Sequence, residues 1–266
     1  MEKETIEVRV LEGFGLYVGG RQVELISSAQ RLVAFLALQE RGVARSYVAG
    51  ELWPAADATR AGANLRSAVW RVQRNCRQLI VGQGQQLALG RDVLVDMRRA
   101  SRRARRLLDR DGVGVWAWND EQRRELVAEV LPDWCDHWVI VVQEEFHQLR
   151  LHALESICTR LIEVGRVGEA VDVGMSATRA EPLRESAHRV LIEAHLAAGN
   201  RWEAQRQFER CRALLLQELG LEPSDELTQL VRWIAATPDR RVGQGISGAA
   251  RPEPPVPVGR RVSAVG

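Results

Sequence analysis

Apolar and polar residues alternate along the first part of the chain, which is typical of half-buried β-strands. Residues 6–10 place valine and isoleucine on one face between charged residues, and a second alternation runs over residues 14–18. Gly19 and Gly20 form a two-residue hairpin signal before a third short run at residues 22–25. This pattern predicts a small antiparallel sheet at the N-terminus.

From residue 29 onward the apolar positions recur every three or four residues, which is the spacing of amphipathic helices. We expect helices over residues 29–40, 46–53 and 59–77, and Gly42 and Pro54 mark the ends of the first two. The third helix has one apolar stripe, formed by Ala61, Leu65, Ala68, Val69, Val72 and Cys76. This stripe predicts the side of the helix that packs against the core.

The other faces of the third helix carry five arginines and no acidic residue between Arg60 and Arg77. A face that only meets solvent normally carries both signs of charge, so we interpret this one as a DNA-binding surface; a solvated face is the alternative. Arginine can bind guanine or phosphate through two hydrogen bonds, asparagine can bind adenine, and serine can bind either. The residues expected near bases or nearby phosphates are Asn64, Ser67, Trp70, Arg71 and Arg74, and those expected to hold the DNA backbone are Arg60, Arg66 and Arg77.

Two short apolar runs flank a Gly-x-Gly tip within residues 79–89, which predicts a β-hairpin. The order of sheet, three helices and hairpin predicts a winged helix, and the sequence resembles the OmpR-type winged-helix DNA-binding domain. Residues 60–74 look like the recognition helix of the branch found in actinobacterial regulators. The resemblance implies that this helix enters the major groove and that the hairpin meets the neighbouring minor groove or backbone. The tip offers Gln83 where family members often carry arginine, and Gln83 completes the predicted DNA-binding set.

A further helical stripe over residues 97–108 carries six arginines between Arg98 and Arg106 on its other faces. We interpret these arginines as solvated or as ion-paired with the acidic half of the chain. Contact with the DNA backbone beside the winged helix is the alternative.

An internal repeat follows, because Gly165 and Gly199 lie 34 residues apart, as do the Glu-Ala pairs that end at Ala170 and Ala204. A period of 34 residues is typical of the paired helices of tetratricopeptide repeats. The second repeat should have the longer second helix, and a helix over residues 225–236 should cap the stack. We therefore expect an all-α, tetratricopeptide-like domain.

Three stretches, residues 131–139, 148–155 and 217–224, resemble the bacterial transcriptional activation domain. Together with the winged helix, residues 5–236 resemble the short form of the Streptomyces antibiotic regulatory protein family. The expected fold is mostly α with a small β part: a winged helix with an N-terminal antiparallel sheet and a C-terminal hairpin, then the helical domain. We divide the chain into a DNA-binding domain (1–95), an activation domain (96–240) and a disordered tail (241–266).

This resemblance implies a transcriptional activator that binds direct repeats in promoter DNA, with two or more protomers on the DNA as a homodimer or in tandem. It implies recruitment of RNA polymerase, including the sigma factor, and the loop at residues 54–59 is one candidate surface. It also implies control of a pathway for a secondary metabolite such as an antibiotic. No receiver domain precedes the first strand, so we expect no switching by aspartyl phosphorylation on this chain.

The distribution of charge along the chain agrees with this division into a DNA-binding domain and an activation domain. The formal net charge of the 266 residues is +2, but residues 1–110 carry +8, residues 111–240 carry −9 and residues 241–266 carry +3. A basic half suggests a polyanionic partner for that half alone.

Several other protein classes are disfavoured. The single lysine, Lys3, lies at the terminus, which argues against P-loop and Schiff-base enzymes. The four scattered cysteines fit a reducing cytoplasm, and we expect no cofactor, metal, membrane contact or catalysis. Two alternatives remain open: a tetratricopeptide-type scaffold that binds proteins and not DNA, and a regulator that responds to a small ligand.

Overall fold

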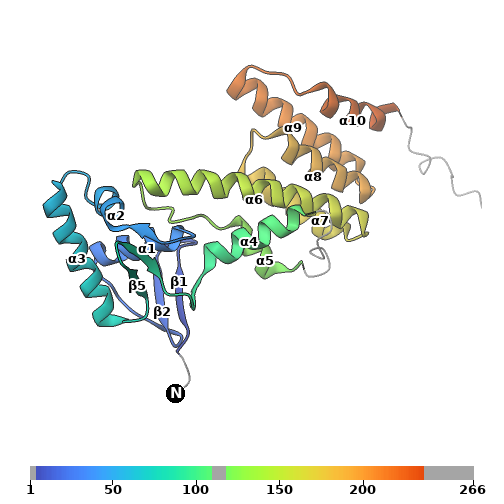
Figure 1. Cartoon of the computed structure of the whole chain (residues 1–266). Helices are drawn as coiled ribbons and strands as arrows, with labels where there is room; N and C mark the ends of the chain where they lie inside the picture. The colour runs from blue at the N-terminus through green and yellow to red at the C-terminus, as the bar shows by residue number, and fades with distance from the viewer. Residues whose placement is uncertain (1–3, 110–117, 237–266) are drawn as a thin grey trace, which may run out of the picture.

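The computed structural model describes residues 4–109 and 118–236 and is shown in Figure 1. Its N-terminal part contains a four-stranded sheet with the order β3-β2-β1-β7. β1 and β2 are antiparallel, whereas β7 runs parallel to β1 and places Val95 beside Val8. The strands are β1 (Ile6–Arg9), β2 (Gly15–Val18), β3 (Arg21–Gln22) and β7 (Val93–Val95).

Three helices and a second sheet, with the order β4-β6-β5, complete the predicted winged helix. These elements are α1 (Ser27–Leu38), β4 (Val43–Ala44), α2 (Arg45–Leu52), α3 (Ala58–Asn75), β5 (Ile80–Gln83) and β6 (Gln86–Leu89). α3 ends two residues earlier than predicted because Cys76 adopts an extended backbone, with a φ of −151°. The sequence did not predict β4 and β7, because strands of two or three residues carry too little alternation to be recognised.

The rest of the described chain is helical. Its helices are α4 (Asp96–Leu108), α5 (Asp120–Val127), α6 (His137–Glu163), α7 (Val167–Ala180), α8 (Glu185–Ala197), α9 (Arg201–Leu219) and α10 (Asp225–Ala236). α10 has the predicted bounds, and the mostly helical fold class is confirmed. The tail over residues 241–266, which we expect to be disordered, lies outside the described residues.

The 34-residue repeat corresponds to two successive helix pairs, α6 with α7 and α8 with α9. Gly165 and Gly199 occupy the turn within each pair, with φ of +78° and +77°, a conformation that favours glycine. Ala170 and Ala204 are fully buried at equivalent places. The second helix of the second pair is longer, 19 residues in α9 against 14 in α7.

α6 is the element that joins the two parts of the molecule, and Figure 1 shows it running from the winged helix into the helical stack. Trp138, Val139 and Phe146 in its first half belong to the core of the winged helix. Leu154 and Leu161 in its second half belong to the core of the helical domain. One long helix therefore contributes to both hydrophobic cores.

Polar contacts reinforce the junction. The buried carboxylate of Asp96 accepts hydrogen bonds from the backbone N–H groups of Val10, Leu11 and Met97. The N–H of Leu131 donates to the carbonyl of Val10 across 2.9 Å, and Arg31 of α1 contacts Asp136 at the start of α6. These bonds hold the helical part against one end of the winged helix and leave α3 on the outer flank (Figure 1).

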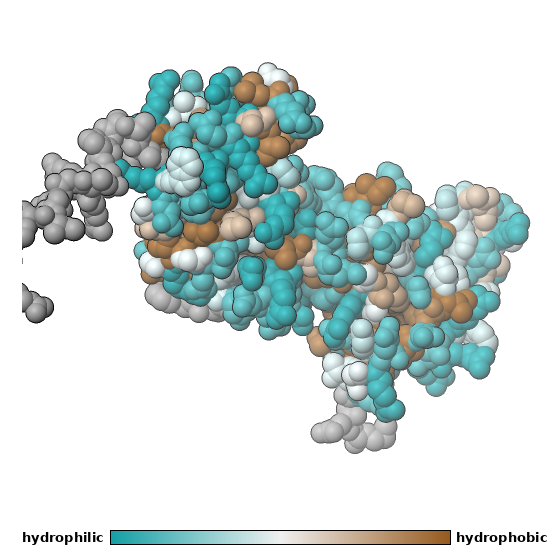
Figure 2. Space-filling view, turned by 180° about the vertical axis from the view of Figure 1, so that it is seen from behind, coloured by the Kyte–Doolittle hydropathy of each residue, from teal (hydrophilic) through white to brown (hydrophobic). Residues whose placement is uncertain are grey.

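The face of the molecule seen in Figure 2 is mostly hydrophilic, with hydrophobic residues in small separate groups. Among the described residues, no helix combines the length and apolar character needed to cross a membrane.

Candidate nucleic-acid interface

α3 is positioned by a cap at its start and by an apolar face along its length. Oδ1 of Asp57 accepts a hydrogen bond of 2.9 Å from the backbone N–H of Arg60, which satisfies one free donor at the helix N-terminus. The predicted apolar stripe is buried, and its members Ala61, Leu65, Ala68, Val69 and Val72 belong to the core shared with α1 and α2. The opposite face therefore points away from the protein.

That opposite face presents nearly all the residues predicted to bind DNA. The exposed ones on α3 are Arg60, Arg66, Ser67, Trp70, Arg71 and Arg74, and Arg77 is exposed in the turn that follows the helix. Asn64 is half-buried, and the backbone of Gln83 lies in the last pair of the β5–β6 hairpin, opposite Gln86. The fold thus gathers the predicted helix residues on one surface, which we call the α3 surface.

The electrostatics of the α3 surface are one-sided. Within the part of the chain that the structure describes, none of its five arginines forms an ion pair. Asp57 is the nearest acid in sequence, and its carboxylate caps the helix. The positive charge of this surface is therefore not balanced by an ion pair among the described residues.

Trp70 adds an aromatic group to the charged surface. It is 58% exposed, and the guanidinium carbon of Arg74 lies 5.1 Å from its ring centroid, within the range of a cation–π contact. An exposed indole can pack against a sugar or a thymine methyl group in a groove.

The hairpin is fixed beside α3 by long-range contacts. The side chain of Gln73 donates a hydrogen bond of 3.4 Å to the carbonyl of Ile80, and the backbone N–H of Arg45 donates one of 2.8 Å to the carbonyl of Gln85. The guanidinium of Arg45 also lies against Gly82, where Nη2 would be 3.1 Å from an added Cβ.

Arg45 is a basic residue of this region that the sequence did not reveal. Its place beside the hairpin depends on the pairing of β4 with β6, which brings Ala44 opposite Gln86. No local pattern around Arg45 signals that pairing.

The arginines of α4 have different surroundings. Arg99 and Arg103 contact Glu125 of α5, and Arg105 contacts Glu40 across 3.1 Å. Arg98 donates to carbonyl groups at the C-terminal end of α1, including those of Leu36 and Ala37. Three of the six arginines of α4 are therefore ion-paired, and two of these three pair with the acidic half of the chain as predicted.

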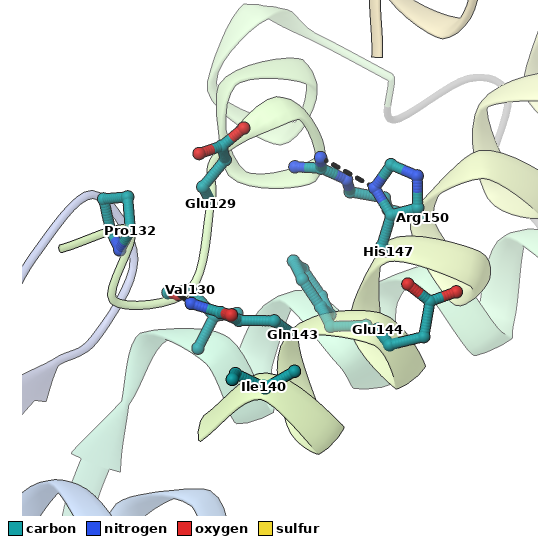
Figure 3. A pocket seen from close by; sticks show the side chains of 9 residues that line it. Glu129, Val130, Pro132, Ile140, Gln143, Glu144, His147 and Arg150 are labelled. Carbon is teal, nitrogen blue, oxygen red and sulfur yellow. Dashed lines mark hydrogen bonds between the residues drawn. The ribbon is translucent and has the colours of Figure 1, made fainter. Parts of the chain in front are cut away.

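A cavity of about 360 Å³ lies between α6 and the segment that connects it to α5 (Figure 3). Arg150 is the buried cation in its wall, and burial lowers its pKa. Its Nη1 donates to the carbonyls of Val127 and Ala128, and its Nη2 lies 3.0 Å from Nδ1 of His147. These partners hold the two terminal nitrogens of the guanidinium, whereas its buried Nε has no hydrogen-bond partner among the described residues.

The described residues include histidines and four free cysteines. They contain no group of three or more histidine, cysteine or acidic side chains that could hold a metal ion. Burial raises the pKa of Cys158 to about 12 and that of Cys211 to about 11, so both thiols stay protonated near neutral pH.

Comparisons with known proteins connect this architecture to transcription. The family model described as "Bacterial transcriptional activator domain" matches residues 95–235, more than half of the chain. The regulatory protein AfsR of Streptomyces griseus is 32% identical over an alignment of 117 residues, which covers 41% of this chain and 12% of that much longer protein.

A solved structure shares the fold. Mycobacterium tuberculosis EmbR, in complex with a low-affinity phosphopeptide, matches with a TM-score of 0.66 and 19% identity over 87% of this chain and 65% of that one. The match extends across both the winged helix and the helical domain. The family match over residues 95–235 shows that the chain belongs to the bacterial transcriptional activator domain family.

Proposed function

We propose that the α3 surface binds the major groove of promoter DNA in a sequence-specific manner. The observation that carries this proposal is the set of five exposed arginines without an ion-pair partner among the described residues. A helix of 18 residues is about 27 Å long, which is long enough to follow a major groove. Asn64, Ser67, Trp70, Arg71 and Arg74 would contact bases or nearby phosphates.

The backbone contacts come from the edges of the same surface. Arg60, Arg66 and Arg77 would bind phosphates on either side of the groove, and Gln83 at the hairpin would contact the adjacent minor groove or backbone. Arg45, which lies against Gly82, is placed to add a phosphate contact beside Gln83. Such contacts set the register, and the base contacts provide specificity.

The proposed activity is transcriptional activation from direct repeats, with protomers bound in tandem or as a homodimer. The loop between α2 and α3 is exposed at Pro54 and Ala55 and lies next to the junction where Arg31 contacts both Leu52 and Asp136. This loop is the proposed contact for RNA polymerase and its sigma factor. The protein would act in the cytoplasm, and its target would be the promoter of a gene cluster for a secondary metabolite such as an antibiotic.

The test is a genome-wide binding assay with the purified full chain, followed by quantitative mobility shifts on the recovered repeat. We expect saturable binding that Arg71→Ala and Arg74→Ala both weaken. Arg189→Ala is the matched control, because Arg189 is an exposed arginine of α8 that pairs with Glu193. No recovered repeat, or equal affinities for all four proteins, would contradict the proposal.

Salt dependence separates this function from a protein-binding scaffold. Each phosphate contact releases about 0.9 counterions, so the affinity for the repeat should fall steeply as salt rises. A scaffold without DNA-binding activity would show no saturable binding to the repeat at any salt concentration.

A further inference from the structure

A basic hollow lies between α7, α8 and α9, within the half of the chain that carries a net charge of −9. Its volume is about 290 Å³. Its charged walls come from Arg179 on α7 and from Arg206, Arg210 and Glu203 on α9. The hollow therefore has the opposite charge to the domain that contains it.

Only part of this positive charge is balanced. Arg206 pairs with Glu203, with 2.8 Å between Nη2 and Oε2. Arg179 and Arg210 are exposed and form no ion pair with any residue that the structure describes. Two free guanidinium groups thus flank one hollow, from two different helices.

The inner wall is partly polar and contains a buried, hydrogen-bonded histidine. His188 is 1% exposed; its Nε2 donates to the carbonyl of Pro182 across 2.9 Å, and its Nδ1 accepts from Gln207 across 2.7 Å. Nδ1 of His195 is buried and has no hydrogen-bond partner among the described residues. Leu191 and Leu214 supply an apolar surface between these groups.

We infer that this hollow binds a small organic anion. Its carboxylate or phosphate group would lie between Arg179 and Arg210, because guanidinium groups bind both anions through paired, charge-assisted hydrogen bonds. Its apolar part would pack on Leu191 and Leu214. The volume, at the lower end of the range for ligand pockets, limits the ligand to about the size of a substituted ring.

The charge of the chain's own tail argues against it as the occupant. Residues 241–266 carry four basic residues and one acidic residue, so like charges would meet in the hollow. The inference concerns a surface distinct from α3 and does not rest on the proposed DNA-binding function.

The test is isothermal titration of the full chain with phenyl phosphate, and with 2-phenylethanol as the neutral probe of similar shape. We expect one saturable site for phenyl phosphate and none for 2-phenylethanol. Arg179→Gln and Arg210→Gln should each weaken binding by about tenfold or more, the loss of a hydrogen bond to a charged group. Arg189→Gln, in an exposed arginine of α8 that is paired with Glu193, should bind like the unmodified chain.

Amide chemical shifts on the unmodified chain provide a second measurement that needs no variant, and the largest changes should occur around Arg210 and Gln207. Equal binding of 2-phenylethanol, unchanged affinity in both glutamine variants, or shifts confined to other helices would overturn the inference. Tighter binding of hexaglutamate than of phenyl phosphate would also overturn it, because the site would then recognise an acidic peptide.

Discussion

α3 and α4 are both rich in arginine, yet their arginines contact different things. The five arginines of the α3 surface form no ion pair within the described chain. On α4, Arg99 and Arg103 contact Glu125, Arg105 contacts Glu40, and Arg98 binds the end of α1. The arginines of the α3 surface are thus without ion pairs among the described residues, whereas four of the six arginines of α4 bind groups of the protein itself.

The difference shows that a run of arginines does not by itself indicate nucleic-acid binding. The partners of the α4 arginines are distant in sequence, since Glu125 lies 26 residues after Arg99 and Glu40 lies 65 residues before Arg105. A run of arginines without acidic residues supports a prediction of nucleic-acid binding only when the folded chain also places no acidic side chain beside it. α3 meets both conditions.

The largest expected effect is a loss of stability on replacing Arg98, an arginine of α4 that binds backbone carbonyls of the protein itself. Arg98→Ala removes hydrogen bonds to the carbonyls of Leu36 and Ala37 and leaves the end of α1 without these donors. Bonds from charged groups contribute about 1.5–3 kcal/mol, so the free energy of unfolding should fall by about 2–3 kcal/mol. Urea denaturation followed by circular dichroism measures this change, and a loss near zero would show that Arg98 is not a structural arginine.

Replacing an arginine of the α3 surface should weaken DNA binding and leave the stability of the protein nearly unchanged. Arg71→Ala should weaken binding to the specific repeat by about 1–3 kcal/mol, because it removes a base or phosphate contact. The free energy of unfolding should stay within about 0.5 kcal/mol, since Arg71 is exposed and unpaired among the described residues. A mobility-shift titration measures the first value and urea denaturation the second. If Arg71→Ala lost stability and kept its affinity, the contrast between the two helices would be wrong.

Glu125 tests the ion pairs of α4 from the acidic side. Glu125→Gln removes the carboxylate that Arg99 and Arg103 share, and its side chain is only 10% exposed. We expect a loss of stability of about 1 kcal/mol, at the upper end for partly exposed pairs. The loss should shrink at high salt, and urea denaturation at two salt concentrations measures it. A salt-independent loss would point to packing as the cause.

Local sequence patterns were sufficient to predict several elements of the fold. The apolar stripe of α3, the hairpin of β5 and β6 and the bounds of α10 follow from periodicity, glycine positions and spacing. The pairing of β7 with β1 and the partners of the α4 arginines depend on residues far away in the chain, so no local pattern predicts them.

Among the predicted site residues, the exposed set on α3 follows from helical geometry alone, because residues opposite a buried stripe must face outward. Trp202 shows that residue type alone is not sufficient: tryptophan side chains are largely buried on average, yet Trp202 is 73% exposed, whereas Trp138 is buried. The periodicity places Trp202 on α9 but does not say which faces of α9 its neighbours cover.

Arg102 gives the smallest expected effect and the sharpest test of the contrast. It lies on α4, is exposed, and forms no ion pair with the described residues, so in its own contacts it is like an arginine of α3. However, α3 lies on the outer flank of the winged helix and α4 lies toward the helical stack (Figure 1). Arg102→Ala should therefore change neither the free energy of unfolding nor the affinity for the repeat by more than about 0.5 kcal/mol. The slope of log affinity against log salt concentration shows whether Arg102 contacts the DNA backbone. An unchanged slope means that position, and not only the lack of a partner, defines the DNA-binding arginines; a slope reduced by about one would place α4 on the DNA backbone as well.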